Sequence, residues 1–167
     1  MKRLAIAVTM LAIGVAGCGS SSNPTSPDTI KIFTVPLSSA NENPPITNAE
    51  QGAKGTAVIT IHTDTNTIDF SVSLNSFPNG ANVILAHIHP GVAGVNGPAL
   101  IGVGLSATNN LPLPNGSGTF TFTGVTAQTS SATAAANVQA ILANPQNFYF
   151  NVHTTANPGG VMRGQMQ

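Results

Sequence analysis

Three of the four histidines in this 167-residue chain occur in two short segments. His87 and His89 lie within residues 86–91 (AHIHPG), and His153 lies within residues 147–154 (NFYFNVHT). Side chains alternate between the two faces of a strand, so His87 and His89 point to the same side. Two such imidazoles can bind one metal ion. A third from a neighbouring strand would complete a three-nitrogen site that suits copper or zinc and keeps an open position.

A structural role for the same histidines stays open beside the metal site. Hydrogen-bonded imidazoles would then tie the loop at residues 90–98 and the C-terminal segment to the domain. In a metal site, Asn151 or a backbone carbonyl is expected to hold the tautomer of a ligand histidine. Arg163 is the only arginine outside the first 17 residues, and we expect it to bond to carbonyl groups at the end of the domain. His62, beside Thr63 and Asp64, is expected to be solvated.

Short runs of alternating apolar and polar residues surround these segments and predict the strands that position them. Residues 64–66 and 112–116 have the composition of turns. About eight short strands with such turns are typical of a β-sandwich or small barrel. The expected strands cover residues 30–37, 55–62, 67–75, 83–89, 98–105, 118–124, 147–154 and 160–167.

One segment departs from this pattern. Residues 131–144 (SATAAANVQAILAN) are rich in alanine, with Val138, Ile141 and Leu142 at helical spacing. Ser130 or Ser131 would cap a short helix near residues 131–143, and the following Asn-Pro would end it. We expect this helix to lie across an open end of the sandwich.

The N-terminus is typical of an exported protein. Residues 1–17 have a basic start, an apolar run and a small pair before the chain's one cysteine, which predicts a signal peptide. The sequence VAGC ending at Cys18 resembles the bacterial lipobox, which implies a lipidated cysteine carrying acyl chains such as palmitate. Several acyl chains anchor a protein stably. We therefore expect a lipoprotein of the outer membrane or cell surface, with a flexible tether at residues 18–29 and a domain at 30–167.

Charge and motifs exclude several classes of function. After the signal peptide, three basic side chains remain against five acidic ones, so no basic patch is present for nucleic acid. A single cysteine excludes a disulfide framework and a cysteine-based zinc site. No Gly-x-Ser-x-Gly motif occurs, and the glycines of residues 91–97 lack the lysine of a phosphate loop. We expect no catalytic residues.

Short motifs spread along the chain resemble the CHRD (chordin) domain family over about residues 32–167. This resemblance implies a secreted or surface β-sandwich and little chemistry. Val161 and Met162 stand where family members often carry an acidic residue and isoleucine. The motifs are LSSANENPP at residues 37–45, Gly52 with GTA at 55–57, AHIH at 86–89, YFNVHT at 149–154 and PGGVMRGQ at 158–165.

A more distant likeness is to copper/zinc superoxide dismutase. In that resemblance His87, His89 and His153 fall at copper-ligand positions, and Arg163 approximates the substrate-guiding arginine. The bridging histidine, the zinc ligands and the disulfide cysteines have no counterparts in this chain. The two resemblances together imply an antiparallel Greek-key β-sandwich, immunoglobulin-like or dismutase-like.

Two functions follow as expectations. The first is a non-enzymatic binding or structural module, anchored to a membrane by lipid, whose loops contact an envelope or extracellular protein or a glycan. The second is a copper- or zinc-binding protein that uses the three histidines, with dismutase-like chemistry as its furthest extension.

Overall fold

The computed structural model describes residues 30–167, so the predicted signal peptide, Cys18 and the tether lie outside the described part. The elements are β1 (Ile30–Ser38), η1 (Ser39–Asn41), β2 (Lys54–His62), β3 (Thr67–Asn75), β4 (Ala81–Pro90), β5 (Ile101–Gly102), β6 (Leu111–Leu113), β7 (Gly118–Thr126), α1 (Ala134–Ala143), η2 (Pro145–Asn147), β8 (Phe148–Thr154) and β9 (Met162–Gln165).

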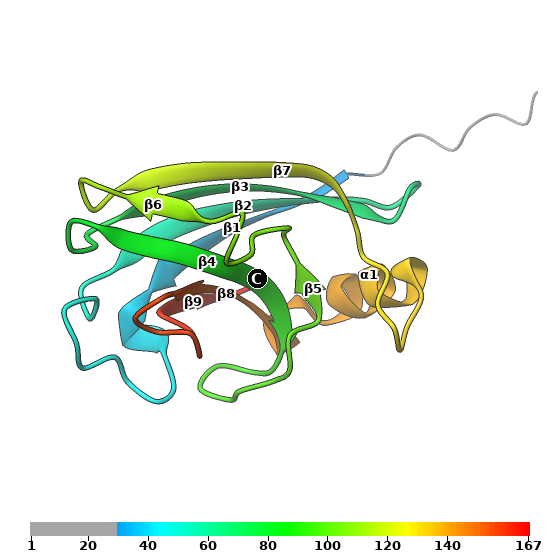
Figure 1. Ribbon diagram of the computed structural model, residues 1–167. Coiled ribbons are helices and arrows are strands. Elements are labelled where there is room, and N and C mark those ends of the chain that lie inside the picture. The colour runs from blue at the N-terminus through cyan, green and yellow to red at the C-terminus, as the bar shows by residue number, and fades with distance from the viewer. Residues whose placement is uncertain (1–29) are drawn as a thin grey trace, which may run out of the picture.

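The strands form one continuous antiparallel sheet that curls over on itself. Its order is β5-β4-β8-β9-β1-β2-β3-β7, and β6 pairs with β4. Strands β1, β2, β3 and β7 make one layer, and β4, β8 and β9 make the layer that faces it (Figure 1). The layers connect where β9 pairs with β1, at Ser38 and Arg163. The predicted all-β, antiparallel, sandwich-like fold of about eight strands is confirmed.

Alternation explains why the hairpin of β2 and β3 forms. Ala57, Ile59 and Ile61 are fully buried, and they alternate with more exposed residues. The two strands pair without a break from Lys54 with Asn75 to His62 with Thr67. In the turn between them Asn66 has a φ of 55°, a left-handed conformation that asparagine tolerates better than most residues.

The hydrophobic core lies between the two layers. Phe70 of β3 and Phe150 of β8 stack across it, with ring centroids 5.7 Å apart. Ala86 and Ile88 of β4 also face the core. Because alternate residues of a strand point to opposite faces, the intervening residues of β4 and β8 project from the outer face of the second layer.

Two strands differ from the sequence-based expectation. The strand expected over residues 98–105 is only the two-residue β5, because Pro98 has no backbone donor and Gly104 has a φ of 94°. Part of the turn expected at residues 112–116 belongs to the short strand β6, which buries Leu113.

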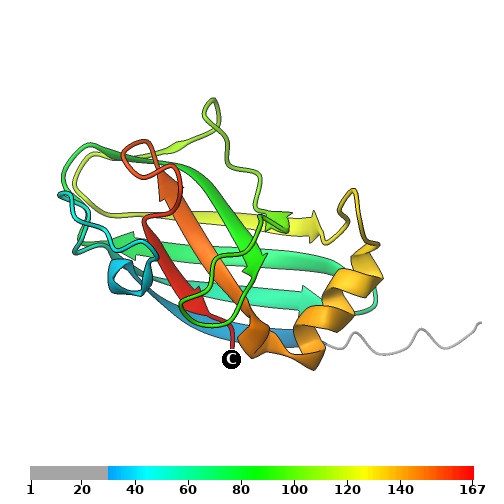
Figure 2. The same ribbon diagram turned by 90° about the horizontal axis from the view of Figure 1, so that it is seen from below.

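The predicted helix is present as α1, at one end of the curled sheet (Figure 2). Its cap is Thr133, not Ser130 or Ser131. The Thr133 hydroxyl accepts a hydrogen bond from the Ala136 N–H at 3.2 Å, which satisfies a donor of the first helical turn. No helix within residues 30–167 has the length and apolar character needed to cross a membrane.

Candidate metal centre

The pairing of β4 with β8 brings the three histidines onto one face. His87 lies opposite Asn151 and His89 lies opposite Tyr149, while His153 is one alternate position further along β8. Directly opposed residues of antiparallel strands share a face, so all of these side chains project outward from the second layer. The structure therefore brings together the three residues that sequence spacing suggested as ligands.

The imidazole rings form a compact cluster. The ring centroid of His87 lies 5.4 Å from that of His89 and 5.0 Å from that of His153. One ring nitrogen of each residue lies within 4.8 Å of the other two. His87 Nδ1 and His153 Nε2 are 3.2 Å apart, near the separation of roughly 3.3 Å expected for two nitrogens bound about 2.0–2.1 Å from one tetrahedral metal.

Two backbone carbonyls fix the tautomers of the cluster. His89 Nδ1 lies 3.0 Å from the oxygen of Gly97, and His153 Nδ1 lies 3.0 Å from the oxygen of Pro158. A carbonyl only accepts, so both Nδ1 atoms carry the proton and both Nε2 atoms offer a lone pair. His87 Nδ1 then donates to His153 Nε2. Outer partners of this kind are what orient histidine ligands in metal sites.

His89 Nε2 is a buried acceptor without a donor. The residue is only 6% exposed, and this nitrogen has no hydrogen-bond partner among residues 30–167. A buried polar atom left unpaired costs free energy, and unpaired groups in native folds call for an explanation. This lone pair lies beside His153, whose ring centroid is 5.8 Å away. A bound cation would satisfy it.

All three imidazoles are held neutral. Burial, and then the nearby His153 and His89, lower the pKa of His87 to about 4. Burial also lowers the pKa values of His89 and His153, although the carbonyl partners of these rings oppose the shift. Neutral imidazole is the form that binds a metal, so the cluster is ready for a cation at neutral pH.

A loop covers the cluster from outside. Residues 91–97 cross the outer face of the second layer (Figure 2). The Gly97 N–H donates to the Tyr149 hydroxyl at 3.1 Å, and the Tyr149 ring stacks on His89 at 4.9 Å with an interplanar angle of 7°. The guanidinium carbon of Arg163 lies 4.7 Å from the centre of the Tyr149 ring. A stack of three side chains thus backs one edge of the cluster.

Arg163 ties this stack to the loops. It is 4% exposed, and its Nη2 lies 3.0 Å from a carboxylate oxygen of Glu42, which is 7% exposed. It also donates to the carbonyls of Asn43 and Val95 and to Asn96 Oδ1. Burial raises the pKa of Glu42, and Arg163 partly opposes that rise.

Glu42 and Tyr149 were missing from the sequence-based set of site residues. Glu42 lies in a loop 121 positions before Arg163. The available signal was that a buried arginine needs an acidic partner, but the sequence after residue 17 offers five acidic residues. Tyr149 shares its strand face with His153, but spacing alone does not indicate a stack.

Two residues depart from their expected surroundings. Asn151 does not hold a histidine tautomer, since carbonyls do so; its Oδ1 is buried without a partner among residues 30–167. Its side chain packs so closely on Gly160 that a Cβ there would lie 2.6 Å from the amide nitrogen. His62 is not simply solvated, because its Nε2 lies 2.9 Å from Asp69 on the neighbouring strand.

One comparison with known proteins gives a match. A family model, that of the CHRD domain, matches residues 33–166. The comparisons with curated proteins and with solved structures give no match.

Proposed function

Because the chain belongs to the CHRD domain family, we propose that its domain is a non-enzymatic module that binds one copper or zinc ion. Family membership supports a non-enzymatic module. The proposed ligands are His87, His89 and His153. The observation that carries the proposal is the unpartnered, buried Nε2 of His89 beside two other ring nitrogens.

The bound state accounts for this arrangement better than a structural role does. A hydrogen-bonding role would explain His153, whose two ring nitrogens both have partners. It explains the Nδ1 of His89, which bonds to the Gly97 carbonyl, but leaves the Nε2 lone pair desolvated and unpartnered. To offer Nδ1 to a cation, His87 would carry its proton on Nε2 instead, so that one ring nitrogen of each histidine would be available to the metal. Three imidazoles suit copper and zinc and leave a fourth position for water or a small ligand.

Binding, and not redox turnover, is what the residues support. The distant likeness to superoxide dismutase would suggest copper chemistry, but the chain has no counterparts of the zinc ligands or the bridging histidine. We therefore place the metal in a structural or sequestering role.

Metal content tests the proposal. Tag-free protein exchanged into zinc or copper(II) and then desalted is expected to retain one equivalent of metal, measured by inductively coupled plasma mass spectrometry. A His87→Ala/His89→Ala variant is expected to retain none, while its circular dichroism stays that of a β protein. Equal, sub-stoichiometric metal in both proteins would contradict the proposal.

We also propose that the module is exported and lipid-anchored at the outer membrane or cell surface, where its loops contact an envelope or extracellular protein or a glycan. The support is the signal-like segment at residues 1–17 and the VAGC sequence that ends at Cys18. Two or more acyl chains on Cys18 would hold the domain at the membrane.

Replacing Cys18 with Ser tests the anchor. The variant is expected to move from the membrane pellet to the soluble fraction on cell fractionation, because a serine hydroxyl cannot receive the thioether-linked lipid. A Ser20→Ala variant is the control and is expected to stay in the pellet. Retention of the Cys18→Ser protein in the pellet would argue against a lipid anchor.

A further inference from the structure

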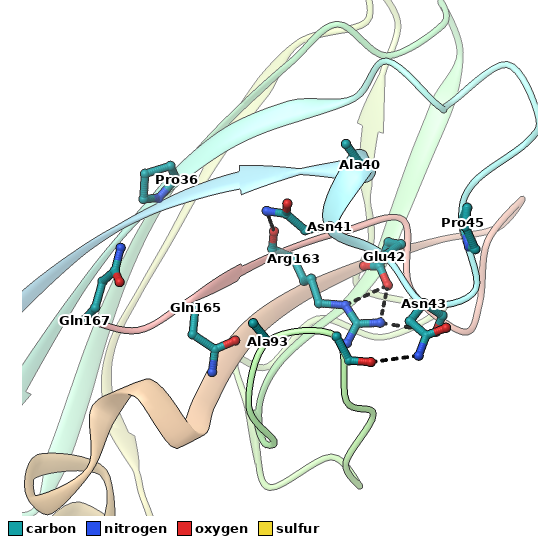
Figure 3. A pocket seen from close by; sticks show the side chains of 11 residues that line it. Pro36, Ala40, Asn41, Glu42, Asn43, Pro45, Ala93, Arg163, Gln165 and Gln167 are labelled. Atoms are coloured by element: carbon teal, nitrogen blue, oxygen red, sulfur yellow. Dashed lines mark hydrogen bonds and ion pairs between the residues drawn. The ribbon is translucent and has the colours of Figure 1, made fainter.

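A cavity of about 670 Å³ lies next to the buried pair of Arg163 and Glu42 (Figure 3). Its volume falls within the range of roughly 300–1,000 Å³ that is typical of small-molecule sites. None of the three histidines lines it. The lining residues are Pro36, Ala40, Asn41, Glu42, Asn43, Pro45, Ala93, Gly94, Arg163, Gln165 and Gln167.

Three side-chain amides of this wall each use their nitrogen as a donor within the protein. Asn41 Nδ2 donates to the carbonyl of Arg163, and Asn43 Nδ2 donates to that of Gly94. Gln165 Nε2 bonds to backbone oxygens, among them that of Gly91 at 2.8 Å. Each amide is thereby fixed in orientation, with its nitrogen turned to the backbone.

The guanidinium of Arg163 is also nearly saturated. Four of its five N–H groups go to Glu42, to two backbone carbonyls and to Asn96 Oδ1. One N–H of Nη1 remains. The charge of Arg163 is balanced by Glu42, so the pair adds no net charge to the wall.

What remains on the wall is a mixed set of acceptors and donors. The side-chain oxygens of Asn41, Asn43 and Gln165 have no hydrogen-bond donor within residues 30–167, in contrast to their nitrogens. Glu42 Oε1 is buried and likewise has no partner there. Donors remain as well: the NH2 groups of Asn41 and Asn43 each carry a second N–H, and the amide of Gln167 offers both a donor and an acceptor.

Such a wall suits a neutral ligand whose polar groups both donate and accept hydrogen bonds. An ammonium or guanidinium group would need a net negative wall to offset its desolvation, and Arg163 already neutralises Glu42. A hydroxyl group does both: it can donate to an amide oxygen while its own oxygen accepts the free N–H of Arg163 or of an asparagine amide.

We propose that this cavity binds a saccharide, with hydroxyl groups donating to the amide oxygens of Asn41, Asn43 and Gln165. The small apolar side chains of the wall, Pro36, Ala40, Pro45 and Ala93, would pack against the C–H faces of the sugar ring. The proposal concerns a site separate from the histidine cluster and does not depend on metal binding.

Saturation-transfer difference NMR on the full-length protein tests the site, with cellobiose, maltose and chitobiose as separate probes. At least one of these disaccharides is expected to receive saturation. An Ala93→Phe variant fills the cavity from an exposed loop position and is expected to abolish the transfer. Ala99→Phe is the matched control, since Ala99 is exposed on the same loop region and does not line the cavity.

Three results would overturn the proposal. The first is no transfer to any of the three disaccharides. The second is transfer that survives Ala93→Phe, which would place the sugar elsewhere. The third is transfer to N-acetylargininamide or to acetyl-tetraglycine amide that Ala93→Phe abolishes when the disaccharides give none, which would assign the cavity to a cation or a peptide.

Discussion

Replacing Arg163 with Met is expected to lower the free energy of unfolding by about 3–5 kcal/mol at pH 7. The substitution keeps much of the side-chain volume but leaves the buried Glu42 carboxylate without its counter-charge. It also leaves Asn96 Oδ1 and the Asn43 carbonyl without their donor. Urea denaturation of the wild type and the variant, followed by circular dichroism, measures the difference.

The pH dependence separates loss of charge pairing from loss of packing. Burial raises the pKa of Glu42 even with Arg163 present, and removing Arg163 raises this pKa further. A carboxyl group whose pKa is raised in the folded state contributes to stability below its unfolded-state pKa of about 4.3. This contribution is lost as the pH rises through the folded-state pKa. The deficit of Arg163→Met should therefore be smaller at pH 4.5 than at pH 7.

A double variant supplies the control for the ion pair. Glu42→Gln/Arg163→Met carries no buried charge at this position and is expected to recover part of the stability lost in Arg163→Met alone. A stability loss below about 1 kcal/mol in Arg163→Met, or a loss equal at both pH values, would contradict this explanation. It would show that the loss does not come from leaving the Glu42 carboxylate without its counter-charge.

Single removal of His89 or His153 is expected to weaken zinc binding by more than about 100-fold, because groups outside the ligand shell alone change affinity by roughly 10–100-fold. That factor corresponds to at least about 2.7 kcal/mol of binding free energy. Competition titration against a chromophoric zinc chelator measures it for His89→Ala and His153→Ala. The reason for a large effect is that both Nε2 lone pairs are oriented in advance by the Gly97 and Pro158 carbonyls.

Two further variants place limits on this effect. His62→Ala is the matched control, since His62 pairs with Asp69 in the other layer, and it should bind zinc as the wild type does. Tyr149→Phe keeps the ring on His89 but removes the acceptor for the Gly97 N–H, so its loss should be smaller than that of a ligand variant. Wild-type affinity in His153→Ala would exclude His153 from the site.

Alternation in the sequence was enough to predict most of the fold. The pattern of β2 and β3 is regular because one face of each strand packs in the core, and the residues between them are of types that form turns. β5 and β6 were harder to predict, because each is short. Their strand conformation depends on pairing with β4 and not on alternation in their own sequences. The cap of α1 shifted to Thr133 because several hydroxyl residues precede the helix and only the fold selects among them.

The site was predictable to the extent that it follows strand periodicity. His87 and His89 share a face by spacing alone, whereas the approach of His153 depends on the register of β4 with β8. A backbone carbonyl was one of the two groups expected to hold a tautomer, but which carbonyls do so was not predictable, because both belong to loops. The pairing of Glu42 with Arg163 closes a separation of 121 residues, which no local pattern encodes.

The loop at residues 91–97 has contacts on two sides. On one side the Gly97 carbonyl holds His89, and on the other Ala93 and Gly94 form part of the cavity wall. A shift of this loop on metal binding would therefore alter the cavity. Such linkage is reciprocal: the factor by which zinc changes the affinity for a sugar equals the factor by which the sugar changes the affinity for zinc. A protein built in this way would respond to the joint presence of two ligands and act as a coincidence detector.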